Sequence, residues 1–387
     1  MKNLILFLTV ISFSCICTIP ASGQTVSTFL TGNGLNGPDG FALDGAQNLF
    51  VANWGGGFGN TVLRITPDAL VSTFDSTSDA PDGLAFDQSG NLYVSNYNSG
   101  IIHKITPTGV KTQFASGLIN PSALAFDTAG NLYVSNNGST TVSKITPDGL
   151  VSIYATGFSA PLGLVFDPAG NLYVSNYNTG IIHKVEPDGT TSVFATVPNG
   201  QNSRIQYLVR GPSGYLYLPA YGHHKIYRIS TSGEVTVYAG TGVPGSTNGS
   251  LDSAQFNGPN SIAMTSLGDL YISEYNANRI RKITGVEFPS GSMADPLPSP
   301  LNINSVRNWP NPFQSTTHIA FESRVQGDIC IQILDFSGKY IHQTTFPNLN
   351  AGTHNIPFDC SAMTPGVYLY KLLFNKNELC REKMIRL

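Results

Sequence analysis

The chain has 387 residues, of which 41% are hydrophobic and 12% charged, a balance that indicates a globular protein long enough for two domains. Its 21 basic and 24 acidic side chains give a formal net charge of -3 at pH 7, so it lacks the basic field that gathers phosphate backbones, and nucleic acid is excluded as a partner. Outside the N-terminal segment only Cys330, Cys360 and Cys380 remain, which excludes a disulfide scaffold.

The N-terminal segment has the pattern of an export signal. Lys2 is followed by an apolar run from Leu4 to Ile19 and then by the small residues of the string PASG, which end before Gln24. This run is too short for a permanent membrane anchor, so residues 1–23 are predicted to be a cleaved signal peptide. No later stretch is long and apolar enough to span a bilayer, and the mature chain is expected to have no transmembrane segment.

A repeat organises the region that follows. The string NLYVSN starts at Asn91, Asn131 and Asn171, which are 40 residues apart, and related strings start at Asn48, Tyr215 and Asp269. Each of the six units holds four short apolar runs separated by turn residues, which is typical of one propeller blade. The last unit lacks its fourth run, and the N-terminal string VSTF supplies it. Residues 24–286 are therefore predicted to form an all-β, six-bladed β-propeller closed by an N-terminal strand.

The repeats also carry a family resemblance. The sixth unit, Ala239 to Thr284, with its string NRIRKI, resembles the NHL repeat. Units two to four resemble the virginiamycin B lyase group and, more distantly, the gluconolactonase-like propellers. Because lyase and hydrolase relatives need a general acid or base, the resemblance makes His223 and His224 of the irregular fifth unit the catalytic candidates. The sequence places no carboxylate partner beside them.

Two columns of the repeat are predicted to surround the mouth of the central channel. The loops entering the first strand of each unit contribute Asp39, Asp82, Ser122, Leu162, Gln206 and Asn260. The loops after the second strand contribute Asn53, Asn96, Asn136, Asn176, Ala220 and Glu274. The carboxylates of Asp39, Asp82 and Glu274 suit Ca²⁺ or Mg²⁺, although no motif requires a cofactor. In the alternative interpretation the asparagines bond to loop backbone and the carboxylates are solvated.

The position after the second column is aromatic in five of the six units. The aromatic side chains are Trp54, Tyr97, Tyr177, Tyr221 and Tyr275, and the third unit has Asn137. Aromatic faces on a wet rim suit sugars or flat organic molecules, so these five residues are predicted to bind a ligand together with Asn96, Asn136 and Asn176. The alternative is packing between neighbouring blades.

A change of composition marks the end of the propeller. Residues 287–304 are rich in Pro and Ser and are predicted to be a linker, and the alternating runs of residues 305–387 predict a small immunoglobulin-like β-sandwich. The motifs NWPNPF, AGTHNI, PGVYLYKL and the terminal KMIRL resemble the type A C-terminal sorting domain of the type IX secretion system of Bacteroidetes. The resemblance implies the type IX machinery as a partner and a secreted or outer-surface location. The alternative is a carbohydrate-binding or spacer sandwich.

These patterns lead to one functional hypothesis and one rival. The sequence predicts a secreted, non-catalytic propeller that binds an extracellular ligand, glycan or protein at the channel mouth. The rival is a divalent-metal-dependent lyase or lactonase-like hydrolase on the same face, implied by the family resemblance.

Overall fold

The computed structural model describes residues 24–76, 78–265, 268–284, 301–323, 326–335, 339–350, 352–374 and 377–387. The predicted signal peptide and most of the predicted linker lie outside these ranges. Within them, no helix has the length and apolar character needed to cross a membrane. Strands dominate, and the helical elements are only short turns: η1 (Gly55–Gly57), α1 (Gly200–Ser203), η2 (Tyr221–His223) and η3 (Tyr275–Ala277). The all-β prediction is confirmed.

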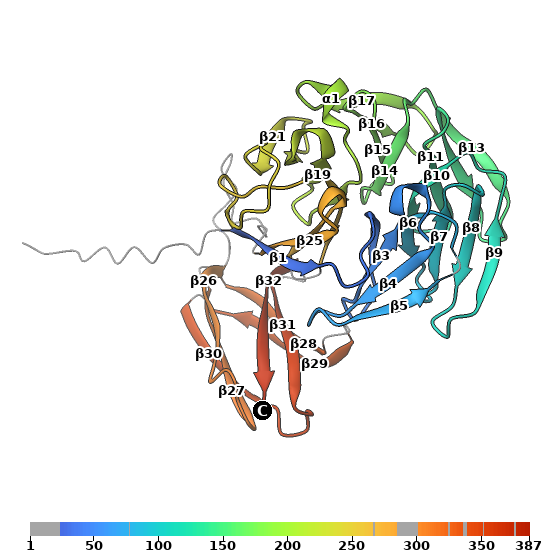
Figure 1. Ribbon diagram of the computed structural model, residues 1–387. Helices are drawn as coiled ribbons and strands as arrows, with labels where there is room; N and C mark the ends of the chain where they lie inside the picture. Colours follow the sequence, from blue (N-terminus) through green and yellow to red (C-terminus); the bar gives the residue numbers. More distant parts are fainter. Residues whose placement is uncertain are drawn as a thin grey trace, which may run out of the picture.

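The described residues of the repeat region form six antiparallel sheets arranged around a common axis, as in a β-propeller (Figure 1). The first three sheets contain β2 (Pro38–Leu43), β3 (Leu49–Asn53), β4 (Thr61–Ile65) and β5 (Val71–Asp75); β6 (Pro81–Phe86), β7 (Leu92–Asn96), β8 (Ile101–Ile105) and β9 (Lys111–Ala115); and β10 (Pro121–Phe126), β11 (Leu132–Asn136), β12 (Thr141–Ile145) and β13 (Val151–Thr156). The next two contain β14 (Pro161–Phe166), β15 (Leu172–Asn176), β16 (Ile181–Val185) and β17 (Thr191–Thr196); and β18 (Val209–Arg210), β19 (Leu216–Ala220), β20 (Lys225–Ile229) and β21 (Val235–Ala239).

The sixth sheet joins the two ends of the repeat region. It has the strand order β22 (Gly249–Ser250), β1 (Thr25–Thr31), β25 (Arg279–Thr284), β24 (Leu270–Glu274) and β23 (Pro259–Met264). β1 pairs with β25 in the register Val26 to Ile283, and both side chains are buried. The predicted closure by the N-terminal strand is confirmed.

Turn chemistry explains why the units repeat an aspartate. In the loop between β6 and β7, the carboxylate of Asp87 accepts hydrogen bonds from the backbone N–H groups of Ser89 and Asn91, each at 2.9 Å. Gly90 takes a φ of +78°, which a residue with a side chain rarely adopts. Burial raises the pKa of Asp87, but the bonds from Asn91 and the charge of Lys104 more than offset it, so the net pKa is lowered. The aspartate is therefore part of the scaffold.

Apolar residues of the central strands form the core between neighbouring sheets. In the second sheet, Tyr93 lies between Phe114 and Phe126 in edge-to-face contacts, with ring centroids 4.9 and 5.0 Å apart. Tyr133 makes the equivalent contacts with Tyr154 and Phe166. Because each aromatic pair adds to the stabilisation from buried area, the repeated string fixes neighbouring sheets in the same relative position.

The C-terminal residues form two further sheets that share an apolar core. The first contains β26 (Leu301–Trp309), β27 (Thr316–Ser323) and β30 (Gly352–Asp359), and the second contains β29 (Tyr340–Leu349), β28 (Gly327–Asp335), β31 (Gly366–Phe374) and β32 (Asn377–Arg386). Phe321 of β27 and Ile331 of β28 belong to the same buried cluster. Cys330 and Cys360 are free thiols. The strict alternation of buried residues along β27 is the pattern of a sheet with one face against a core.

Candidate functional site

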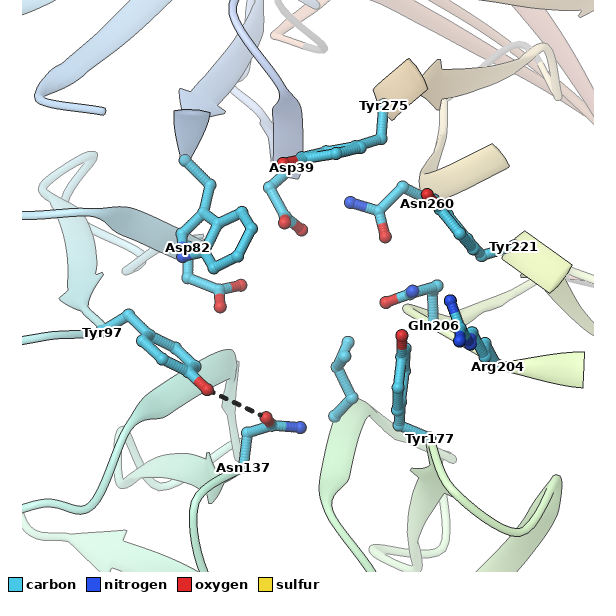
Figure 2. Close-up of a pocket in the computed structure, with 12 residues that line it drawn as sticks. Asp39, Asp82, Tyr97, Asn137, Tyr177, Arg204, Gln206, Tyr221, Asn260 and Tyr275 are labelled. Carbon is cyan, nitrogen blue, oxygen red and sulfur yellow. Dashed lines mark hydrogen bonds between the residues drawn. The ribbon is translucent and has the colours of Figure 1, made fainter. Parts of the chain in front are cut away.

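A cavity of about 350 Å³ opens at the predicted channel mouth (Figure 2). It brings together five of the six first-strand residues and all six positions of the aromatic column. The lining residues are Asp39, Asp82, Leu162, Gln206, Asn260, Trp54, Tyr97, Asn137, Tyr177, Tyr221, Tyr275 and Arg204. The equivalent positions of the repeat therefore predicted where this cavity lies. The residues that differ between units determine its chemistry.

Close approach of the first strands places two carboxyl groups side by side in the cavity. A Cβ atom on Gly40 would lie 2.0 Å from the backbone oxygen of Asp82, so β2 and β6 can approach this closely only because Gly40 has no side chain. Asp39 and Asp82 precede the glycines at this contact, and both point into the cavity in Figure 2. They are buried, with exposed fractions of 9% and 6%.

Tyr207 closes the floor beneath the two carboxyl groups. Its hydroxyl donates a hydrogen bond to Oδ1 of Asp82, and the hydroxyl of Ser122 donates to the same oxygen at 3.0 Å. Tyr207 follows Gln206 and so occupies the column that holds Gly40, Gly83 and other small residues in the other units. The sequence analysis did not identify Tyr207, although a tyrosine at a position that holds a small residue in the other units indicates a special role.

Burial shifts the ionisation of both carboxyl groups. The pKa of Asp82 is raised to about 6 by burial, which outweighs the hydrogen bonds from Tyr207 and Ser122. The pKa of Asp39 is raised well above its ordinary value by burial and by the charge of Asp82, against hydrogen bonds from Asn260 and Tyr207. Two carboxyl groups in low dielectric cannot both ionise freely, and a cation placed between them would favour their charged forms.

Aromatic rings form a nearly continuous wall around the cavity. Trp54 contacts Tyr97 and Tyr275 at ring-centroid distances of 5.9 and 6.0 Å, and Tyr275 contacts Tyr221 at 6.3 Å. Tyr177 stands on the opposite side, beside Gln206 (Figure 2). These rings come from different sheets, so they pack between neighbouring sheets and also face the cavity. The packing interpretation of the aromatic column is therefore confirmed, and ligand binding by these rings stays a prediction.

Arg204 is the cationic residue among those that line the cavity. Its guanidinium lies 6.0 Å from the ring centroid of Tyr221, within cation–π range. Burial raises the pKa of Tyr177, and the charge of Arg204 acts against this rise. The backbone of Arg204 is left-handed, with a φ of +46°, at the end of α1. The sequence analysis missed this residue because it lies in the irregular loop of the fifth unit, where the repeat gives no register.

The asparagines of the second column have a different role from the one predicted. Asn96 and Asn176 accept hydrogen bonds from the backbone N–H groups of Asp79 and Ser159, and their amide groups donate to the carbonyls of Ile101 and Ile181. Asn136 donates to the hydroxyls of Thr141 and Ser143. The three side chains are buried and are not among the residues that line the cavity. Their assignment as ligand-binding residues is corrected: they fasten the loops that carry the aromatic rings.

Glu274 is also separated from the predicted metal site. Its carboxylate accepts a backbone hydrogen bond from Asn257, as the asparagines do in their units, and it pairs with Arg279 and Arg281 at 3.3 Å each. Because both oxygens are engaged by these cations, Glu274 does not join Asp39 and Asp82. Among the described residues, no group of three or more His, Cys, Asp or Glu side chains is arranged to hold a metal ion.

The two candidate histidines lie outside the cavity. Nδ1 of His223 is 3.0 Å from the hydroxyl of Tyr227, and Nδ1 of His224 accepts a hydrogen bond from the backbone N–H of Gly258 at 3.1 Å. Burial lowers the pKa of both imidazoles. His223 lines a separate open groove with Lys225 and Val237. The two catalytic candidates implied by the family resemblance are therefore not among the residues that line the mouth cavity.

Solved structures of similar fold include enzymes and binding proteins. A catalytically inactive histidine-to-alanine variant of virginiamycin B lyase from Staphylococcus aureus with quinupristin is 17% identical, with a TM-score of 0.52, over 77% of this chain and 96% of that chain. An auxiliary nutrient binding protein from Bacteroides ovatus is 17% identical, with a TM-score of 0.58, over 67% and 76%. A gluconolactonase from Xanthomonas campestris is 16% identical, with a TM-score of 0.51, over 64% and 85%. A search of curated proteins finds no match.

Two family models match separate parts of the chain. The model described as secretion system C-terminal sorting domain matches residues 307–386, so the protein is handled by type IX secretion and is exported to the cell surface or secreted. The model described as virginiamycin B lyase family matches residues 7–244, which is more than half of the chain. The chain therefore belongs to the virginiamycin B lyase family.

Proposed function

We propose that the protein is an exported propeller that binds a small ring-bearing molecule, such as a glycan unit, in the mouth cavity. The observation that carries this proposal is the wall of five aromatic rings around a cavity of about 350 Å³, a volume within the range of small-molecule sites. Rings on the wall offer faces for stacking, and the polar groups of Gln206, Asn260 and Asn137 orient a ligand.

The polar groups that line the cavity support a binding function over a catalytic one. In the described structure the imidazole of His223 is bonded to Tyr227 of β20 and that of His224 to the backbone of Gly258, whereas carboxyls, amides and one guanidinium line the cavity. The solved lyase with quinupristin is inactive as a histidine-to-alanine variant, whereas this cavity is lined without a histidine among the described residues. A nutrient binding protein of the same fold is a precedent for a non-catalytic role.

The binding proposal is tested by removing two rings from opposite sides of the cavity. Tyr97→Ala with Tyr177→Ala is expected to lower affinity for the best ligand in a glycan and metabolite screen by at least about tenfold, because each stacking contact contributes roughly 1 kcal/mol or more. Isothermal titration calorimetry on the full mature chain measures the change. Tyr340→Ala is the matched control, because Tyr340 is exposed on the C-terminal sheets. Unchanged affinity in the double variant would exclude this cavity as the site.

The second candidate function is a divalent-metal-dependent lyase or lactonase activity. Family membership favours it, and Asp39 and Asp82 with the amide oxygens of Gln206 and Asn260 are oxygen donors of the kind that Ca²⁺ and Mg²⁺ take. A metal held there would act as a Lewis acid. Turnover of streptogramin B or a lactone that disappears with a chelator and in Asp82→Ala would establish this function in place of simple binding.

We further propose a finer architecture for the same molecule. The six sheets of the described repeat region are the blades of one closed NHL-type propeller over residues 24–286, and the two C-terminal sheets over residues 305–387 are an immunoglobulin-like sandwich. Residues 1–23 act as the signal peptide, and residues 287–304 as the linker. N-terminal sequencing of the exported protein is expected to begin at Gln24.

A further inference from the structure

On the acidic side of the mouth cavity, one carboxyl oxygen of Asp82 faces the space that a ligand would occupy. Both hydrogen bonds to Asp82 in the described structure arrive at Oδ1, from Tyr207 and Ser122, and none is made to Oδ2. The side chain is only 6% exposed, and its carboxyl group points into the cavity (Figure 2). Oδ2 therefore has no donor within the described chain, and a ligand in the cavity can supply one.

No ion pair within the described chain neutralises the carboxyl groups of Asp39 and Asp82. The ion pairs near this face join Glu274 to Arg279 and Arg281 instead. The cavity's own cation, Arg204, lies across the cavity from Asp82 and is held against Tyr221 and Tyr177 (Figure 2). When the two aspartates are ionised, a countercharge therefore has to come from outside the described chain, and a cationic ligand would favour this ionised state.

The aromatic wall suits the same kind of countercharge. Tyr97 lies beside Asp82 and Tyr275 lies beside Asp39 (Figure 2), and the ring of Trp54 contacts both tyrosines. Ring faces attract ammonium groups through their quadrupoles, and the attraction increases when the cation is desolvated. A carboxyl pair inside a ring of tyrosine and tryptophan side chains combines both kinds of contact within one small volume.

We propose that the ligand is a ring-bearing molecule with a protonated amine, and that the ammonium group lies against Asp82 and Asp39 while the ring stacks on the aromatic wall. This inference rests on the proposed binding function and narrows its ligand class to organic cations such as amino sugars and aryl-ethylamines. A neutral sugar leaves the carboxyl groups without a countercharge. A bare metal ion makes no use of the rings.

Matched pairs of probes test the charge directly on the unmodified full chain. Tyramine and its alcohol analogue tyrosol differ in the amine, as do glucosamine and glucose. Calorimetry near pH 7.5 is expected to show at least about tenfold tighter binding of the amine in one pair or both, and the pair that shows it tells whether the ring is aromatic or a sugar. A separate titration with calcium chloride alone tests whether the cavity binds a metal ion instead.

Variants then assign the effect to the aspartates. Asp82→Asn keeps an acceptor for Tyr207 and Ser122 and is expected to reduce the amine's advantage to less than about threefold, and Asp39→Asn is the second variant if the first folds poorly. Asp68→Asn is the control, because Asp68 is an exposed turn residue and its loss removes the same charge elsewhere.

Several outcomes would overturn the inference. If tyrosol or glucose binds as tightly as its amine, the cavity binds ligands but not through charge, and the proposed function survives alone. If calcium binds with the same dependence on Asp82 and displaces the amines, the site is a metal site. If none of the four probes binds, the inference fails, and the Tyr97 and Tyr177 double variant decides the binding function separately.

Discussion

Asp82 is expected to make the free energy of unfolding depend on pH. Its folded pKa of about 6 lies above the ordinary value of 3.8, so its contribution to stability is complete below about pH 4 and is lost as the pH rises through 6. Asp82→Asn removes this loss, and the variant is expected to be more stable than the parent at about pH 8, by roughly 2–3 kcal/mol. Burial and the charge of Asp82 raise the pKa of Asp39, so Asp82→Asn also lowers the pKa of Asp39 and adds to this gain. Tyr207 and Arg204 are present in both proteins.

Thermal unfolding of both proteins between about pH 4 and pH 8 provides the measurement. The difference in free energy of unfolding is expected to shrink toward zero at the acid end, where Asp82 is protonated. Turn aspartates with lowered pKa, such as Asp87, lose stability below about pH 4 in both proteins and cancel in the comparison. A constant difference across the whole range would show that Asp82 does not titrate with a raised pKa.

Arg281 is the second residue whose removal has a definite consequence. It is fully buried, and it pairs with Glu274 and donates to the backbone carbonyls of Gln255 and Thr247. Arg281→Met is expected to cost about 3–5 kcal/mol, because it removes the fully buried one of the two cations that pair with a buried carboxylate. Denaturant unfolding of this variant and of the double variant with Glu274→Leu checks the cause: the double variant is expected to recover part of the loss.

Single residues also show how far the sequence could predict the site. The 40-residue repeat placed the aromatic column and the first-strand column at one mouth, because equivalent positions in equivalent sheets must share a face. It could not show that Asn96 turns inward to fasten a loop, because a repeat fixes the position of a residue and not the direction of its side chain. Arg204 and Tyr207 were missed where the repeat breaks, and there the chemistry depends on the local backbone.

At the scale of elements, β1 decides whether the ring of sheets is closed. It comes from the start of the chain and pairs with β25 from the end of the repeat region, burying Val26 and Leu30. The strand was predictable because its string VSTF repeats the outer strand of the first unit. The β22 pairing on its other edge was not predictable, because a two-residue strand has no pattern of its own.

Deleting residues 24–30 is expected to lower the melting temperature sharply. The two buried side chains, Val26 and Leu30, each contribute roughly 1.5–3 kcal/mol, and β25 would lose its pairing with β1. Thr28→Ala is the control, because Thr28 lies on the same strand with an exposed side chain. A truncated protein that melts at the same temperature as the parent would contradict the closing role of β1.

At the scale of the whole molecule, the two matched regions have separate tasks. The propeller region carries the mouth cavity, and the C-terminal region carries the sorting signal, with its own buried cluster that includes Phe321, Ile331 and Tyr370. A domain with its own core can fold without the other, so the sorting signal can be removed without disturbing the cavity. Localisation and ligand binding are therefore expected to be separable by deletion.

Deleting residues 307–387 tests this separation in the native host. The truncated protein is expected to remain inside the cell envelope, because the secretion machinery has lost the domain that it recognises, while the purified propeller still binds the ligand of the full chain. Immunoblots of medium, surface-exposed and envelope fractions measure the location, and calorimetry measures the affinity. Fusing residues 301–387 to an unrelated periplasmic carrier is the converse control and is expected to bring the carrier outside. Export of the truncated chain would assign secretion to the propeller, and loss of affinity would show that the two regions form one functional unit.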